Sequence, residues 1–225
     1  MIPPDPAFTV FIVDDDEAAV RGLARLLRSK GYETQSFTSS REFLEQHDLD
    51  RPGCVVLDLS MPDLDGLELQ RALIRDSPLS RPIIFLTGRG DIPASVKAMK
   101  AGAIDFMTKP VDVDGLLEAI AVAVKLDKKA RIEQAEISSI KSRLARLTPR
   151  EREVLTHVVA GKLNKQIAGD LGVVEKTIKV HRARMMRKMN VRTVADLARL
   201  AEKVGLSLGE RLSDNASSHI GLEDN

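Results

Sequence analysis

Residues 8–16 read Phe8-Thr9-Val10-Phe11-Ile12-Val13-Asp14-Asp15-Asp16, an apolar, β-rich run that ends abruptly in three aspartates. A helical periodicity follows, and the same alternation of a short apolar run and a helix recurs along the next hundred residues. The later runs are Tyr32–Phe37, Cys54–Leu57, Pro82–Leu86 and Ala103–Met107, and the helix after the last run is expected at about 112–126. Five strand–helix units in succession predict an α/β, doubly wound, five-stranded parallel sheet with helices on both faces.

Polar side chains follow four of the five predicted strands. Because the carboxyl ends of parallel strands meet at one edge of the sheet, these side chains are expected to converge there. They are Asp14, Asp15 and Asp16 after the first strand, Asp58 after the third, Thr87 after the fourth and Lys109 after the fifth. Clustered carboxylates suit Mg²⁺. A carboxylate beside Mg²⁺ and an ammonium group could accept a phosphoryl group, with the threonine hydroxyl holding the resulting acyl phosphate.

Two other interpretations of this edge are weaker. A single aspartate at a strand end is more often a turn or cap residue, but four strand ends agree here on one chemistry. A phosphatase of the haloacid-dehalogenase type also places an Asp nucleophile on a parallel sheet. That mechanism needs a second Asp two residues later as general acid, where this sequence has Ser60, and no inserted cap domain is visible.

Residues 8–126 resemble the receiver domain of bacterial two-component response regulators, a flavodoxin-like fold. The motifs that carry the resemblance are Val13-Asp14-Asp15-Asp16, Leu57-Asp58-Leu59-Ser60-Met61-Pro62-Asp63-Leu64-Asp65-Gly66, Thr87-Gly88 and Asp105-Phe106-Met107-Thr108-Lys109-Pro110. The resemblance implies a receiver (phosphoacceptor) domain over residues 1–126, which accepts a phosphoryl group from a sensor histidine kinase and does not turn over as an enzyme.

The resemblance also assigns roles to single residues. It implies that Asp58 is the phosphoacceptor and that Asp15 and Asp58 hold Mg²⁺, with Asp14 acting mostly through water and the backbone carbonyl of Ser60 completing the ligands. Ser60 and Arg89 are expected to flank the approach of water to the phosphate.

Further roles concern the last three strands. Lys109 is expected to contact the phosphoryl group, and its peptide bond to Pro110 is expected to be cis. Thr87 and Phe106 are expected to form the switch pair, and Asp16 to cap the following helix or support the metal ligands.

Composition separates the chain into two halves with opposite charge. The 225 residues carry a net charge of +1. Residues 1–126 contribute −6 and residues 127–225 contribute +7, which favours nucleic acid as a partner of the second half. The sequence has no Trp and few other aromatic residues, which argues against nucleic-acid binding by stacking of side chains on bases. The single cysteine, Cys54, excludes a framework of disulfide bonds within the chain. No bilayer-spanning run or signal peptide is visible, so a cytoplasmic protein without membrane contact is expected.

Residues 127–146 are predicted as a helical linker that extends the last receiver helix. Its apolar positions, Ile132, Ile137, Ile140 and Leu144, are partly heptad-like but few. A solvated spacer and a dimerising helix both remain open.

Residues 147–204 predict an all-α, four-helix domain that contains a helix-turn-helix. Thr148 is placed as an N-cap, Pro149 as the first helical residue and Glu151 as its capping-box partner. The tight connection at 171–174 joins two helices, the second of which such modules insert into the DNA major groove. Residues 146–204 carry a net charge of +8.

This segment resembles the LuxR-type DNA-binding domain, and the whole chain resembles the NarL/FixJ class of response regulators. The motifs are Leu147-Thr148-Pro149-Arg150-Glu151-Arg152-Glu153-Val154-Leu155, Gly161, Asn164-Lys165-Gln166-Ile167-Ala168 and Lys176-Thr177-Ile178-Lys179-Val180-His181-Arg182. By resemblance the base-facing residues are Lys179, Val180 and Ala183, the residues near phosphates are Lys165, Lys176 and Thr177, and Arg187 lies on the same exposed side. Residues 205–225 are expected to form a disordered tail.

The sequence therefore predicts a phosphorylation-controlled transcription regulator. The expected partners are a sensor histidine kinase, double-stranded promoter or operator DNA, a second copy of the chain after phosphorylation, and RNA polymerase. An output domain that binds RNA or another protein is the alternative, and the basic recognition helix argues against it.

Overall fold

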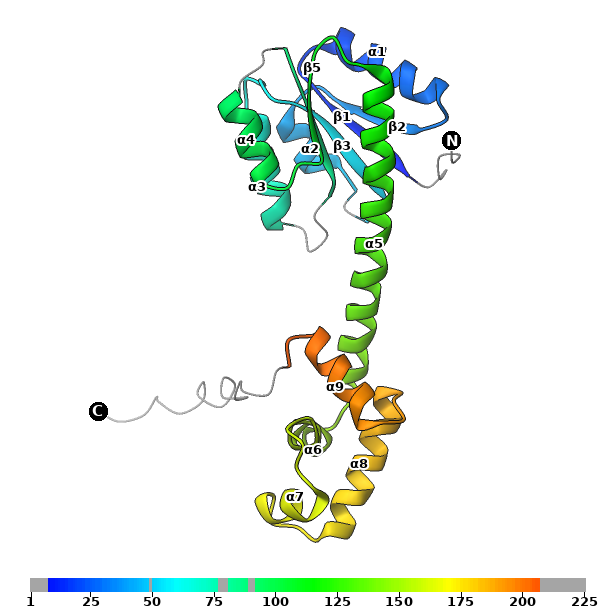
Figure 1. The fold of residues 1–225 in the computed structure, drawn as a ribbon, viewed down its shortest axis with the longest axis vertical. Helices are drawn as coiled ribbons and strands as arrows, with labels where there is room; N and C mark the ends of the chain where they lie inside the picture. Colours follow the sequence, from blue (N-terminus) through cyan, green and yellow to red (C-terminus); the bar gives the residue numbers. More distant parts are fainter. Residues whose placement is uncertain (1–7, 49, 77–80, 89–91, 207–225) are drawn as a thin grey trace, which may run out of the picture. The chain divides into compact units, whose positions relative to one another are not determined.

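The alternation of buried strands and amphipathic helices produces the expected parallel sheet in a computed structural model, which describes residues 8–48, 50–76, 81–88 and 92–206. The sheet has five strands in the order β2-β1-β3-β4-β5, and every neighbouring pair is parallel (Figure 1). Its strands are β1 (Thr9–Val13), β2 (Glu33–Phe37), β3 (Gly53–Asp58), β4 (Ile83–Thr87) and β5 (Asp105–Thr108). The predicted α/β doubly wound class is thereby confirmed.

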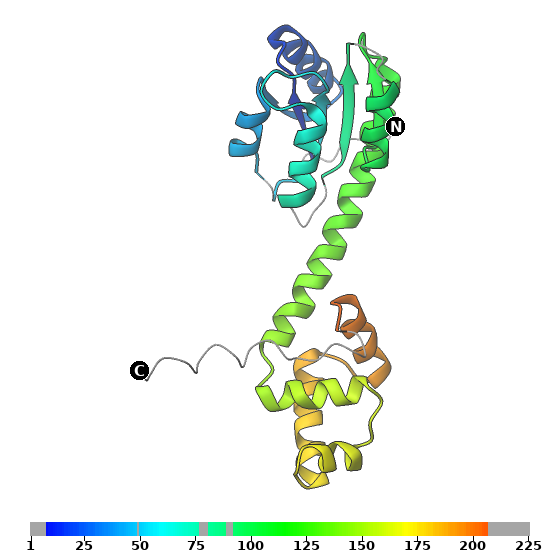
Figure 2. The same cartoon turned by 90° about the vertical axis from the view of Figure 1, so that its left-hand side faces the viewer.

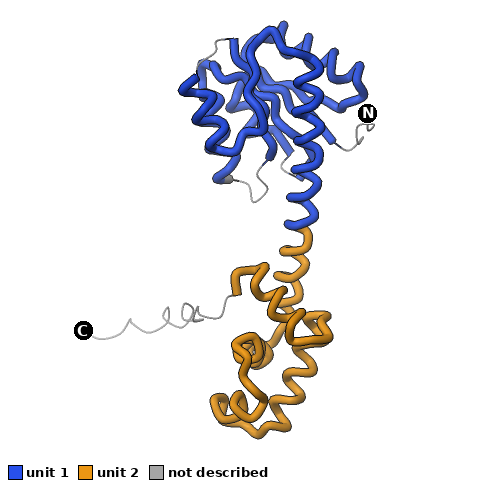
Figure 3. The backbone as a smooth tube through the Cα atoms, in the orientation of Figure 1, with its two compact units in different colours: residues 1–134 blue, residues 135–225 orange. Residues whose placement is uncertain are grey.

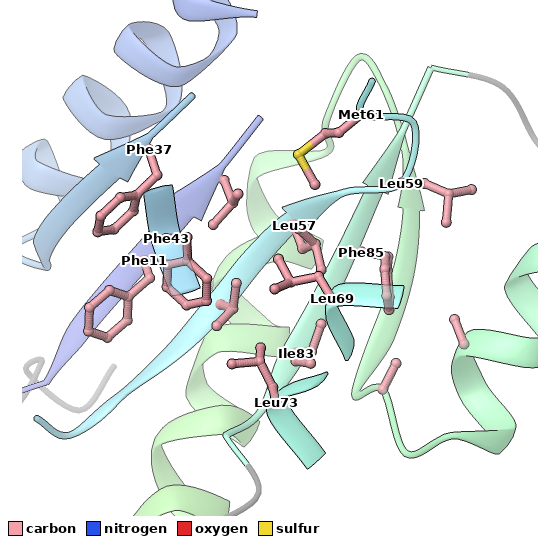
Figure 4. Close-up of a cluster of buried hydrophobic side chains, with 14 of the residues drawn as sticks. Phe11, Phe37, Phe43, Leu57, Leu59, Met61, Leu69, Leu73, Ile83 and Phe85 are labelled. Atoms are coloured by element: carbon pink, nitrogen blue, oxygen red, sulfur yellow. The ribbon is translucent and has the colours of Figure 1, made fainter. Parts of the chain in front are cut away.

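Helices cover both faces of the sheet because the strand residues alternate between two apolar cores. One core joins Phe11, Leu57 and Phe85 to α2 (Ser40–Gln46), α3 (Gly66–Asp76) and α4 (Ile92–Lys100) (Figure 4). The other core joins alternate residues of the same strands to α1 (Glu17–Ser29) and to the first part of α5 (Val113–Ala145). The sheet is thus buried on both sides, and its parallel pairing brings the carboxyl ends of all strands to one edge.

Cys54 is free and buried in the second of these cores, as expected for a small apolar side chain. Burial raises the pKa of its thiol far above the ordinary value, so the thiol stays protonated.

The chain divides into two units, residues 1–134 and 135–225, and the boundary lies inside the predicted linker (Figure 3). Helix α5 begins in the first unit and ends in the second (Figure 2). In the first unit its residues Asp127 and Arg131 form an ion pair of 2.9 Å, and Arg131 also donates to the backbone carbonyls of Asp50 and Arg51. The predicted helical extension of the last receiver helix is observed, and the receiver unit holds α5 beyond Leu126, the predicted end of the receiver domain.

The second unit is helical and has its own apolar core. It contains α6 (Pro149–Val159), α7 (Asn164–Asp170), α8 (Glu175–Met189) and α9 (Val194–Lys203). Thr148 and Glu151 form the predicted capping box at the start of α6. The turn between α7 and α8 uses Gly172 at φ 63°, a conformation that favours glycine. Of the segment predicted as a tail, residues 207–225 lie outside the described residues.

Candidate functional site

Three aspartates converge at the carboxyl edge of the sheet. Asp14 and Asp15 follow β1 and Asp58 ends the neighbouring strand β3, so the strand order brings them together. One carboxylate oxygen from each lies within 4.8 Å of the others. Asp14 and Asp58 are buried, whereas Asp15 is exposed. Three carboxylates, one of them exposed to solvent, fit Mg²⁺, because this ion binds to a few protein oxygens and keeps several water ligands.

Lys109 reaches this cluster from the end of β5. Its Nζ lies 2.6 Å from Asp14 Oδ2 and 2.7 Å from Asp58 Oδ1. Burial by itself lowers the pKa of Lys109, but hydrogen bonds to Asp14 and Asp58 outweigh that effect, and the net pKa is raised. The side chain therefore stays an ammonium group and balances two buried carboxylates.

The backbone around Asp58 is held closely. The Ser60 N–H donates to Asp58 Oδ2 at 2.7 Å, while Lys109 lies 2.7 Å from Oδ1, so both carboxylate oxygens have a partner. A Cβ built on Gly66 would lie 2.5 Å from the carbonyl oxygen of Asp58 and 2.9 Å from the Phe85 ring. Only glycine allows α3 to begin this close to the end of β3.

Asp16 belongs to the helix rather than to the acidic cluster. Its side chain accepts from the N–H groups of Ala18 and Ala19 and caps α1. Its own N–H donates to Asp14 Oδ1 at 3.0 Å and helps to orient that carboxylate. The capping role expected for Asp16 is confirmed.

The expected switch residues lie on β4, which pairs with the strand of Asp58, and on β5, which pairs with β4. Thr87 ends β4 and is buried, and its backbone carbonyl accepts from the Lys109 N–H at 2.7 Å. Phe106 on β5 is half-buried, with its ring centroid 6.1 Å from that of Phe85. The Lys109-Pro110 peptide bond is cis, as expected. Arg89, expected near the approach of water, lies outside the described residues.

Helix α8 of the second unit separates an apolar face from a basic one. Ile178, Met185 and Met189 are buried in the core. Most of the residues expected to face DNA are exposed on the other side. These exposed residues are Lys176, Lys179, Val180, Ala183 and Arg187, with Lys165 exposed on α7 and Thr177 half-buried. The separation follows from the 3.6-residue period of the helix.

Three basic side chains of α8 have partners that the sequence analysis did not identify. Lys179 pairs with Glu175 at 3.0 Å, and the i, i+4 spacing of the two residues could have revealed this. Lys188 pairs with the buried Glu151 at 2.6 Å. Burial raises the pKa of that carboxyl, but the Lys188 and Thr148 hydrogen bonds dominate, so the pKa of Glu151 is lowered. Arg182 donates to the Asn164 side chain at 2.8 Å.

Several proteins are similar to this chain along most of their length. The chain is 44% identical over 198 residues to "Nodulation protein W" of Bradyrhizobium diazoefficiens, which covers 88% of this chain and 87% of that protein. It is 42% identical over 194 residues to "Transcriptional regulatory protein FixJ" of Rhizobium meliloti, with coverage of 86% and 95%. The solved structure of the response regulator StyR matches with a TM-score of 0.75 and 45% identity, covering 88% of this chain and 99% of that chain.

A doubly wound sheet with an acidic cluster at its carboxyl edge, joined to a helix-turn-helix unit, defines a response regulator with a DNA-binding output. Residues 10–121 match the family "Response regulator receiver domain", and residues 145–201 match "Bacterial regulatory proteins, luxR family". The chain belongs to the NarL/FixJ class of two-component response regulators, which regulate transcription. Among the described residues, none of the helices is both long and apolar enough to cross a bilayer.

Proposed function

We propose that a cognate histidine kinase phosphorylates Asp58, and that this modification promotes dimerisation and sequence-specific binding to promoter or operator DNA. The observation that carries the proposal is the pocket itself, where Asp58 and Lys109 meet beside Asp14 and Asp15. The protein would act in the cytoplasm, with RNA polymerase as a downstream partner. Asp58 would accept one phosphoryl group for each signal rather than turn over substrate.

In the phosphoryl transfer, a carboxylate oxygen of Asp58 attacks phosphorus while the bond from phosphorus to the donor breaks. Mg²⁺, held by Asp15, Asp58, the Ser60 carbonyl and, through water, Asp14, would supply positive charge beside the transferring oxygens. Lys109 would move its ammonium group from the carboxylates to the phosphoryl oxygens. The Thr87 hydroxyl would then bind the phosphoryl group.

The Asp58 assignment is tested with acetyl phosphate as a small phosphodonor. The wild-type protein should be labelled only when Mg²⁺ is present, and Asp58→Asn should abolish labelling. Asp63→Asn, an exposed carboxylate in the next loop, is the matched control and should be labelled like the wild type. Full labelling of Asp58→Asn would overturn the assignment.

The switch would carry the signal from the pocket to the surface around residues 95–107. Thr87 and Phe106 connect these two places, since they lie on the adjacent strands β4 and β5. Helix α4 exposes the apolar side chains of Val96 and Met99, which suits a pairing surface. Phosphorylation can shift the equilibrium between two conformers of this surface only by the difference in free energy with which the phosphate stabilises each of them.

Sedimentation of the phosphorylated chain tests this coupling. Phosphorylation should produce a dimer together with tighter operator binding. Thr87→Ala should leave Asp58 phosphorylated while reducing dimerisation. A phosphorylated wild-type chain that stays monomeric at micromolar concentration with unchanged DNA affinity would contradict the coupling.

The DNA contacts are tested by comparing two lysines of α8. Lys176→Ala should weaken cognate and random duplexes equally and reduce the salt slope by about one unit, because it removes one phosphate contact. Lys179→Ala should cost roughly 1–3 kcal/mol on the cognate duplex alone. Equal loss on both duplexes would show that Lys179 does not contact bases. Preference for RNA over duplex DNA at equal salt would favour the alternative output.

A further inference from the structure

The last third of α5 contributes side chains to the core of the second unit. Ile140 is only 1% exposed and packs in the same cluster as Val154, Met185 and Leu197, which come from α6, α8 and α9. Leu144, one helical turn later, packs against this cluster. The match to the luxR family begins only at residue 145, so this contribution lies outside the family's own segment.

Polar contacts hold the same segment against α8 and α9. The Arg143 guanidinium donates through Nη1 to the backbone carbonyl of Met189 at 3.1 Å, and through Nη2 to the Ser139 hydroxyl at 3.1 Å. Lys203 on α9 pairs with Glu136 at 2.6 Å. Residues 136–144 therefore contact three helices of the unit by packing or by hydrogen bonds.

Met189 is the last residue of the recognition helix α8, and Asn190 after it turns into the left-handed region at φ 55°. The last carbonyls of a helix have no partner within it, and the helix dipole places partial negative charge there. A guanidinium group satisfies both requirements. Arg143 is thus placed to fix the end of α8 from a different helix.

The position of this end matters along the whole recognition helix. The 15 residues of α8 are about 22 Å long at 1.5 Å per residue. A tilt of about 3° at Met189 therefore displaces the first turn by about 1 Å, which is enough to misalign side chains with base edges.

We infer that residues 136–144, the last part of α5, are an integral part of the DNA-binding unit and that Arg143 is a positioning residue for DNA recognition. The inference rests on the proposed function. Ile140 and Leu144 cannot also form the seam of a coiled coil without leaving this core, so the segment is neither a solvated spacer nor a dimerising helix built on those residues.

The test uses the full chain with acetyl phosphate and Mg²⁺, and a duplex that the wild-type protein selects from a random library. Arg143→Met should reduce the preference for the selected duplex over a random one by about tenfold, the scale of one lost base contact. Affinity for the random duplex and its salt slope should stay within about twofold, because Arg143 is not expected to touch phosphate. Lys141→Met, an exposed cation on the same helix, is the matched control and should change neither.

Two further results separate positioning from a merely structural role. Arg143→Lys keeps a cation near the Met189 carbonyl and should restore most of the preference; it also carries the test if Arg143→Met does not fold. Amide hydrogen exchange in Arg143→Met should rise in the last turn of α8. Equal losses on both duplexes, or an unchanged preference, would overturn the inference. A wild-type chain that prefers no duplex would instead refute the proposed function.

Discussion

Replacing Ile140 by alanine should destabilise the C-terminal unit and leave the receiver unit unchanged. Ile140 is 1% exposed in the core of residues 135–206, although its helix begins in the other unit. The substitution removes three carbons, and about 0.8 kcal/mol for each gives about 2.4 kcal/mol of lost transfer free energy. The remaining cavity adds to this, so the expected loss is roughly 3–4 kcal/mol.

The single tyrosine provides a probe that follows the receiver unit alone. Tyr32 is the only tyrosine, there is no Trp, and Tyr32 packs against the receiver core, so its fluorescence follows the receiver alone. Far-UV circular dichroism follows the helices of both units. At about 4–8 °C for each kcal/mol in a domain of this size, Ile140→Ala should lower the Tm of the C-terminal unit, which Tyr32 does not report, by roughly 12–32 °C. The Tyr32 transition should stay unchanged.

Ile132→Ala is the matched control, since Ile132 lies on the same helix and is 63% exposed. It should change the free energy of unfolding by no more than about 0.5 kcal/mol. A loss below about 1 kcal/mol for Ile140→Ala, or a shift of the Tyr32 transition, would refute the burial argument. The prediction thereby tests where the DNA-binding unit begins without measuring DNA binding.

Three further predictions concern charged groups. Burial lowers the pKa of His47 from its ordinary value of 6.5, so its contribution to receiver stability should be full above pH 6.5 and be lost as the pH falls through the lower folded value; His47→Gln should remove this slope in denaturant titrations, and an unchanged slope would contradict it. The pKa of Glu151 is lowered, so its carboxylate stabilises the second unit fully above pH 4.5, the ordinary pKa of a glutamate. This stabilisation is lost as the pH falls through the lower pKa of the folded state. Glu151→Gln leaves the half-buried Lys188 ammonium without its carboxylate partner and should therefore cost roughly 1–3 kcal/mol at pH 7 and less at low pH, and equal costs at both would refute this. Glu175→Gln should release Lys179 and strengthen binding to the cognate duplex by a few-fold at low salt; unchanged binding would show that the pair does not restrain Lys179.

The receiver fold and its site could be predicted from the sequence because their signals are local. Each strand is a short apolar run, each is followed by its own helix, and the polar residues stand directly at the strand ends. A parallel sheet then brings these ends to one edge whatever the details of packing. The start of α6 could also be predicted, because the two residues of its capping box, Thr148 and Glu151, are only three positions apart.

Partnerships between distant residues could not be predicted in this way. Lys188 and Glu151 are 37 positions apart and Arg143 and Met189 are 46 apart, so no periodicity links them. In the sequence Lys188 is simply one more basic residue of a DNA-binding helix. In the structure its ammonium group balances a buried carboxylate.

The sequence by itself determined that residues 127–146 are helical and carry a sparse apolar stripe at Ile137, Ile140 and Leu144. The same stripe suits a spacer, a coiled coil or a helix packed on a domain, because amphipathic spacing specifies that a face is apolar and not what covers it. Only the tertiary structure decided that α6, α8 and α9 cover Ile140. The physical reason is that burial depends on which surfaces meet in three dimensions, and those surfaces come from residues far along the chain.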